Sequence, residues 1–394
     1  MNKLEIPTPS QNLIKRRRFL GLAAGGVAAF ALVPGRNLVR DFDFLSDERN
    51  ILEGARPLAE HLRPPKSLRG VGVNSLNVYL YDEDIQRHAV SSCQSLGGKH
   101  MRIFVDDWED PLEAHPGAYN KGQIEKIRRF CELVATVDPT ISVTLDVFDF
   151  YPFVAATPNG VYGAPSGFST PYLEKNTHHE NPQVDFFLNP EKFALYSERA
   201  RFVVSMLADI PNLVAFGVAN EFHLPPEFGS VQKREMTTEW FAKAATAIRA
   251  VAPRSVIYTG TRHPLVIDES LLSDTNGIVN TAHPYPMMGF DWDSLTAHLP
   301  KMRLPLLIQE LGIPTHIYYG KIPVPSDELL VGLMKKTLSH LTYIDEKGTR
   351  RIASEHFAPW KAHSGHPQDY FPNPADLPAS SLMLRKLSSV ITNL

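Results

Sequence analysis

The alternation of short apolar runs with amphipathic helical windows constrains the fold of this chain more than any other sequence feature. Seven apolar runs lie at 68–74, 101–105, 141–148, 213–220, 255–260, 277–283 and 306–311, and a weaker eighth lies at 351–360. Helical windows separate them at 83–96, 123–137, 190–207, 237–251 and 326–341, with a short one at 265–272 and a last one at 379–390. Strands that alternate with helices pair in parallel. Eight such units predict a closed barrel of parallel strands.

The rival to this barrel is a doubly wound open sheet, but no glycine-rich phosphate-binding turn follows any of the apolar runs. We therefore expect an α/β fold of the (β/α)8 TIM-barrel type, as a single domain over residues 67–394. Residues 32–66 carry no clear period and are expected to form a linker and N-terminal wrap. The segment 149–189 is too long for an ordinary loop, so we expect a long loop insertion after strand 3 that covers the site.

The N-terminus has the form of a targeting segment. Basic residues from Lys15 to Arg18 precede Phe19, and a Gly/Ala-rich apolar stretch follows to Ala31. This stretch is shorter than the ~20 residues that a spanning helix needs, so residues 1–31 are interpreted as an export signal. The pair Arg16-Arg17 resembles the bacterial twin-arginine type, although Lys15 stands where that type prefers Ser or Thr. We expect export to the bacterial periplasm or beyond, without membrane attachment once the signal is cleaved. The alternative is a basic amphipathic surface segment.

Charge and cysteine content limit the partners. The formal net charge is −3, and no basic stripe occurs outside the N-terminus, so a nucleic-acid partner is not expected. Cys93 and Cys131 could pair in an oxidising compartment, but two buried free thiols are favoured. The neighbouring His178 and His179 are better explained as solvated loop than as metal ligands. We expect no metal, no other cofactor and a monomer.

Two apolar runs each end on a glutamate, Glu221 and Glu310. A carboxylate at the tip of a buried strand lies where burial and neighbouring charges tune its pKa. The two residues are 89 positions apart, and a barrel of about 250 residues spends roughly 31 on each unit, so three units take about 93. The spacing thus predicts that both carboxylates reach the same barrel mouth. Two carboxyl groups about 5–5.5 Å apart are what retaining glycoside hydrolysis requires.

Asn220 strengthens this interpretation, because an amide beside the catalytic carboxylate can hydrogen-bond a sugar 2-hydroxyl. The structural alternative is an Asn-Glu pair that caps the next helix. The pairing of Glu221 with a second strand-end glutamate favours a glycosidase.

Four motifs resemble glycoside hydrolase family 5, which belongs to clan A. The segment 214–223, with Asn220-Glu221-Phe222, resembles the signature around the acid/base, with Phe222 where the family usually has Pro. The other three resemble the arginine strand, the His-x-Tyr motif of strand six and the nucleophile strand: Met101-Arg102-Ile103, His283-Pro284-Tyr285 and Gln309-Glu310-Leu311-Gly312. Phe148 departs from the pattern, because many members have His there.

The resemblance implies that Glu221 is the general acid/base and Glu310 the nucleophile. It implies that Arg102 and Tyr285 keep Glu310 ionised, and that His283 holds the acid/base or a sugar hydroxyl, a core histidine being the alternative. Sugars stack on aromatic faces, so further substrate contacts are expected from Trp360, as the floor of a subsite, and from Trp108 and Trp292. Trp240, inside a helical window, is expected in the core.

The resemblance points to a β-linked polysaccharide or oligosaccharide as the substrate, with β-1,4-mannan and β-1,4-glucan both open. The alternative function is a non-catalytic glycan-binding barrel in an envelope or exopolysaccharide system. Such a barrel would keep its aromatic residues but would tolerate loss of either glutamate.

Overall fold

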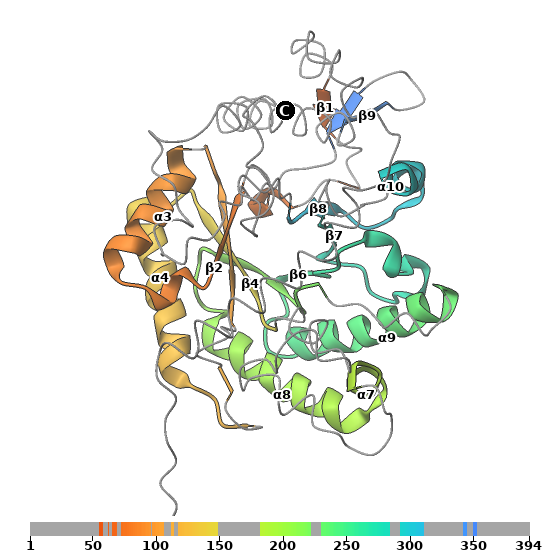
Figure 1. The fold of residues 1–394 in the computed structure, drawn as a ribbon, viewed down its shortest axis with the longest axis horizontal. Helices are drawn as coiled ribbons and strands as arrows, with labels where there is room; N and C mark the ends of the chain where they lie inside the picture. Colours follow the sequence, from red (N-terminus) through yellow and green to blue (C-terminus); the bar gives the residue numbers. More distant parts are fainter. Residues whose placement is uncertain are drawn as a thin grey trace, which may run out of the picture.

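A curled parallel sheet of seven strands forms the centre of the computed structural model (Figure 1). The structure describes residues 55–57, 62, 65–68, 72–95, 97–105, 112–113, 117–148, 182–221, 230–283, 292–310, 342–344 and 350–352. The strands pair in chain order: β2 (Gly72–Leu76), β3 (His100–Phe104), β4 (Ser142–Asp146), β5 (Leu213–Gly217), β6 (Val256–Tyr258), β7 (Ile278–Ala282) and β8 (Leu306–Ile308). The predicted (β/α)8 architecture is confirmed, with seven of its strands among the described residues.

Helices connect the strands and lie outside the sheet (Figure 1). They are α3 (Glu83–Ser95), α4 (Lys121–Val137), α7 (Pro182–Leu188), α8 (Pro190–Leu207), α9 (Ser230–Arg249) and α10 (Trp292–His298). Local sequence explains where two of them begin. The side chain of Asn120 accepts a hydrogen bond from the backbone N–H of Gln123 and so caps α4, while Asn189 caps α8 and is followed by Pro190 at the first helical position.

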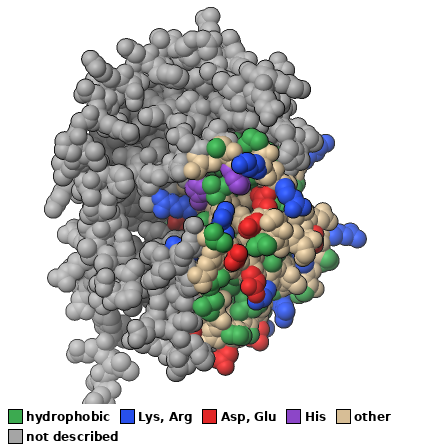
Figure 2. All heavy atoms as spheres, turned by 90° about the vertical axis from the view of Figure 1, so that its right-hand side faces the viewer, with side chains coloured by type: hydrophobic (Ala, Val, Ile, Leu, Met, Phe, Trp, Pro, Cys, Tyr) green, Lys and Arg blue, Asp and Glu red, His purple; other side chains and the backbone are tan. Residues whose placement is uncertain are grey.

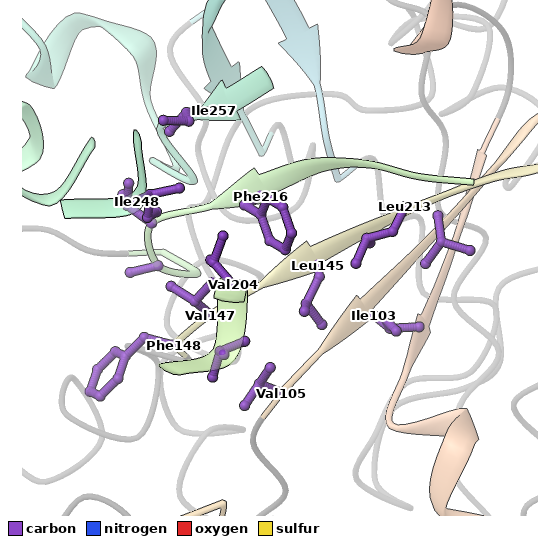
Figure 3. Close-up of a cluster of buried hydrophobic side chains, with 14 of the residues drawn as sticks. Ile103, Val105, Leu145, Val147, Phe148, Val204, Leu213, Phe216, Ile248 and Ile257 are labelled. Carbon is purple, nitrogen blue, oxygen red and sulfur yellow. The ribbon is translucent and has the colours of Figure 1, made fainter. Parts of the chain in front are cut away.

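The two faces of the sheet pack differently because successive residues of a strand point to opposite sides. The outward residues form the main core with the helices, as in the cluster of Figure 3, where Ile103, Leu145 and Phe216 from three strands lie near Val204 of α8. Phe216 is fully buried, and truncating it to Ala would cost about 3–5 kcal/mol. The inward residues form a smaller separate cluster: Leu68, Ala215, Tyr258, Val279 and Leu307.

One predicted helix was wrong, and most of the expected eighth strand, residues 353–360, lies outside the described residues. The fifth helix, expected at 265–272, is instead a pair of 3₁₀ turns, η5 (Pro264–Val266) and η6 (Glu269–Leu271). Asp268 separates them, because its side chain accepts from the backbone N–H of Ser270 and starts a new turn. The described start of the expected eighth strand, β10 (Arg350–Ile352), pairs with β1 (Ala55–Pro57) and β9 (Thr342–Ile344) in a separate sheet.

Other expectations fall partly outside the described residues. The windows at 326–341 and 379–390, most of the insertion at 149–181 and the loop with His178 and His179 lie there. Within the described part, Cys93 and Cys131 are buried free thiols, as favoured. Trp240 is buried, with its ring 4.7 Å from that of Tyr196, which confirms its core position.

No helix in the described part of the chain is both long and apolar enough to cross a bilayer. On the face shown in Figure 2, the acidic, basic and hydrophobic side chains of the described residues are interspersed.

Candidate active site

Arg102 is the hub of a polar cluster at the carboxyl ends of the strands. It lies on β3, its side chain is fully buried, and its guanidinium contacts residues from three other strands. Nε donates to Asp146 Oδ2 at 2.6 Å, Nη2 donates to Asn220 Oδ1 at 2.8 Å, and Nη1 donates to Glu310 Oε1. Burial lowers the pKa of Arg102, but the carboxylates of Asp146 and Glu310 outweigh this effect and raise it. The guanidinium therefore stays charged.

The contact with Arg102 also fixes the amide of Asn220. Arginine has only donors, so the atom that faces Nη2 must be the amide oxygen. The donor Nδ2 of Asn220 is therefore oriented away from Arg102. An amide held in this way is suited to donate to a substrate hydroxyl.

Asp146 lies at the end of β4 and is fully buried. Burial raises its pKa, and the Arg102 guanidinium opposes that rise. Gly217 on β5 makes room for it, because a Cβ at that position would lie 2.2 Å from Asp146 Oδ1 and 2.2 Å from the Tyr258 ring. Burial, and next the charge of Asp146, raise the pKa of Tyr258 well above its ordinary value.

Glu221 lies in a strained turn just beyond β5. Its φ is 51°, a left-handed conformation that is uncommon for a residue other than glycine. Its backbone N–H donates to the carbonyl oxygen of Gly260 at 2.8 Å. Gly260 itself has φ 69°, and a Cβ there would lie 1.7 Å from the carbonyl oxygen of Ala219. The close approach of these two backbones holds Glu221 in place.

His283 joins the two glutamates. It follows β7, is fully buried, and places Nδ1 3.2 Å from Glu221 Oε1 and 3.4 Å from Glu310 Oε1. Its other nitrogen, Nε2, lies 2.9 Å from Gln309 Oε1. The ring is thus held between Gln309 on one side and the two carboxylates on the other.

The three side chains enclose a small reactive space. One ligand atom each from Glu221, His283 and Glu310 lie within 4.8 Å of one another. Glu221 is 13% exposed at its side chain and Glu310 is 6% exposed, so the former is easier to reach from solvent. The same atoms could hold a metal ion by distance, but the guanidinium of Arg102 lies against Glu310 and disfavours a second cation. The arrangement is suited to proton transfer beside an ionised carboxylate.

The structure brings five of the predicted site residues together: Arg102, Asn220, Glu221, His283 and Glu310. Tyr285, Trp108 and Trp360 lie outside the described residues. Trp292 is the first residue of α10, but its side chain is not among the described ones.

Sequence reasoning missed Asp146 and Gln309. A signal for Asp146 was present, because it lies near the end of the third apolar run, as Glu221 and Glu310 end theirs. Gln309 had no such signal, since its role depends on the position of the His283 ring.

Solved structures share this fold at low sequence identity. The endo-β-1,4-mannanase from Thermotoga petrophila is 14% identical with a TM-score of 0.58, covering 83% of this chain and 77% of that one. A glycoside hydrolase family 5 mannosidase from Rhizomucor miehei is 12% identical with a TM-score of 0.57, covering 86% and 98%. Endo-glycoceramidase II from Rhodococcus sp. is 16% identical with a TM-score of 0.55, covering 84% and 81%.

At the sequence level, no protein-family model matches the chain, and no curated protein matches it either. TM-scores of 0.55–0.58 to these three structures, at identities of only 12–16%, establish a shared fold. The chain has the barrel fold of clan A glycoside hydrolases of the family 5 type.

Proposed function

We propose that this protein is a retaining β-glycoside hydrolase in which Glu221 is the general acid/base and Glu310 the nucleophile. The observation that carries the proposal is the cluster of Glu221, His283 and Glu310, with one ligand atom of each within 4.8 Å of the others. Retaining glycosidases hold their two carboxyl groups about 5–5.5 Å apart, whereas inverting enzymes need a wider gap for a water molecule. The short separation therefore favours a covalent intermediate.

In the first step, a carboxylate oxygen of Glu310 attacks the anomeric carbon, while Glu221 donates its proton to the departing glycosidic oxygen. The glycosidic bond breaks, and a glycosyl ester forms on Glu310. In the second step, Glu221 removes a proton from water, which attacks the anomeric carbon and releases Glu310 as a carboxylate. Glu221 thus acts as the acid in the first step and as the base in the second.

The neighbouring side chains support these roles. Arg102 donates to Glu310 Oε1 and favours its ionised form. The oriented amide of Asn220 is suited to donate to the 2-hydroxyl, a contact that strengthens in the transition state. His283 contacts both carboxylates and is suited to orient Glu221.

The proposed substrate is a β-linked polysaccharide or oligosaccharide, with β-1,4-mannan and β-1,4-glucan as the two classes. Structures of similar fold include enzymes named as endo-β-1,4-mannanases, mannosidases and an endo-glycoceramidase. We also propose that residues 1–31 direct export. Sequencing the N-terminus of the protein recovered outside the cytoplasm would test this, and an intact Met1 there would contradict cleavage.

The function is tested by assaying the wild-type protein against a panel of β-mannans, β-glucans and aryl β-glycosides. Glu221→Gln and Glu310→Gln keep the shape of each side chain and serve as matched variants. The proposal predicts hydrolysis by the wild type and loss of at least about 10³-fold on polysaccharide in both variants. Binding without hydrolysis, equal in all three proteins, would instead indicate a glycan-binding barrel.

A further inference from the structure

Asp146 is a third carboxylate in the cluster, and the proposed reaction gives it no role. Its side chain is fully buried, so it has no direct access to a substrate. Its Oδ2 accepts from Arg102, whereas its Oδ1 has no hydrogen-bond partner among the residues that the structure describes. A buried carboxylate with one unsatisfied oxygen is costly. Within the described part of the chain, the hydrogen bond to Arg102 connects this carboxylate to the rest of the cluster.

The contact matters because the guanidinium of Arg102 is planar and rigid. Asp146 holds Nε, Asn220 faces Nη2, and Glu310 faces Nη1. With Nε fixed, rotation of the plane is restricted, and the two remaining nitrogens point toward the other two residues. The orientation of Arg102 toward Glu310 and Asn220 therefore depends on Asp146.

Asp146 also alters the charge balance around Glu310. One positive charge, on Arg102, faces two carboxylates, Asp146 and Glu310. Among the described residues, the other titratable groups that interact with these carboxylates are Tyr258 from β6, Tyr196 from α8, His283 from the end of β7 and Glu221 from the end of β5. Asp146 thus shares the cation with Glu310, which leaves Glu310 more basic than an unshared pair would.

We propose that Asp146 is a positioning residue that sets the orientation of Arg102 and, through it, the alignment and basicity of Glu310. This inference rests on the proposed glycosidase function. It assigns to β4 a part in the reaction, although the Asp146 side chain is fully buried.

Two substitutions separate charge from orientation. Asp146→Asn keeps an acceptor for Nε and removes one negative charge, so Glu310 ionises more easily. The acidic limb of the kcat/KM profile should move to lower pH by at least about half a unit, and kcat should fall by about tenfold or less. Asp146→Ala removes the acceptor as well, so kcat should fall by about 100-fold. An unchanged kcat and pH profile in both variants, with only lower melting temperatures, would overturn the proposal.

Glu113→Gln is the matched control. Glu113 and Arg199 form another fully buried arginine–carboxylate pair, with 3.5 Å between Arg199 Nη1 and Glu113 Oε2. This variant loses the same charge from the same kind of pair, and its acidic limb should not move. An equal shift in Glu113→Gln would show that the effect is not specific to Asp146 and would contradict the proposal.

Wild type and Glu310→Ala are assayed alongside, because a wild type that hydrolyses no β-glycoside would refute the proposed function rather than the role of Asp146. That role has a readout independent of activity. A crystal structure of Asp146→Ala should show the Arg102 fork turned away from Glu310 or Asn220. A fork that keeps both contacts would overturn the inference.

Discussion

The ring nitrogen Nδ1 of His283 lies 3.2 Å from the carboxylate oxygen Oε1 of Glu221. Gln309 holds the opposite nitrogen of the ring, so the imidazole has one orientation toward the carboxylates of Glu221 and Glu310. This contact places the imidazole where it can assist proton transfer by Glu221. Loss of either partner should therefore affect the acid step first.

Glu221→Ala should retain activity on aryl glycosides with activated leaving groups, because these need little protonation to depart. Azide added to the medium should accelerate this variant, since azide attacks the glycosyl ester without help from a base. Glu310→Ala should show neither the residual activity on aryl glycosides nor the acceleration by azide, because no glycosyl ester can form. Leaving-group dependence measured with a series of aryl glycosides checks this. Equal loss on all substrates without azide rescue would reverse or refute the two roles.

Arg102→Lys should lower kcat/KM by at least about tenfold, roughly 1.4 kcal/mol of transition-state stabilisation. Lysine keeps the charge but cannot hold Asp146, Asn220 and Glu310 with three fixed donors. The acidic limb of the pH–rate profile should move upward, because a less well-held Glu310 protonates more easily.

Melting temperature is the control for Arg102→Lys, and it should stay within a few degrees of wild type. Unchanged kinetics with a large drop in melting temperature would show that Arg102 only supports the barrel.

Gly260→Ala should destabilise the fold by about 3 kcal/mol or more, because the added Cβ meets the carbonyl of Ala219 at 1.7 Å. Gly117→Ala is the matched control. Gly117 also has a positive φ, 79°, but a Cβ there meets nothing within 4 Å, so only about 1 kcal/mol of backbone strain is expected. Denaturant unfolding of both variants checks the difference, and equal losses would contradict the close approach at Glu221.

The two cysteines should be inert in the folded protein. Burial raises the pKa of Cys93 and of Cys131 to about 12, so almost no thiolate exists at neutral pH. A thiol-specific reagent should modify both only after unfolding. Rapid reaction of the native protein at pH 8 would show that either site opens readily.

The raised pKa of the two thiols also makes the stability of the folded protein depend on pH in the alkaline range. The unfolded thiols ionise near their ordinary value of 9.0, whereas the folded ones keep their protons to about 12. The contribution of these thiols to the free energy of unfolding is thus fully present below about pH 9. It is lost as pH rises toward 12, by about 1.4 kcal/mol for each thiol and each pH unit. The double alanine variant should lose less stability over this window than wild type, and identical slopes would contradict the assignment.

The barrel could be predicted from sequence because each unit joins two clear periods, an apolar strand and an amphipathic helix. Strand ends were less predictable. The apolar run at 213–220 extends beyond β5, because Val218 and Ala219 are buried although they leave the strand ladder. The fifth helix was mispredicted because Asp268 starts a new turn within the window.

The convergence of Glu221 and Glu310 could be predicted because both glutamates end apolar runs at a spacing set by the barrel. The local details could not. Nothing in the sequence indicates that Glu221 adopts φ 51°, because the strain is imposed by Gly260 from the next unit. Similarly, Gln309 acquires a role only once β7 and β8 are placed side by side.

Trapping the covalent intermediate tests the central claim most directly. A 2-deoxy-2-fluoro β-glycoside with a good leaving group forms the ester but slows its hydrolysis, so the ester should accumulate and be seen by mass spectrometry. The account predicts a single glycosyl adduct on the peptide that contains Glu310, and a first product of retained β configuration by NMR. An adduct on another residue, or hydrolysis with inversion and no adduct, would contradict it.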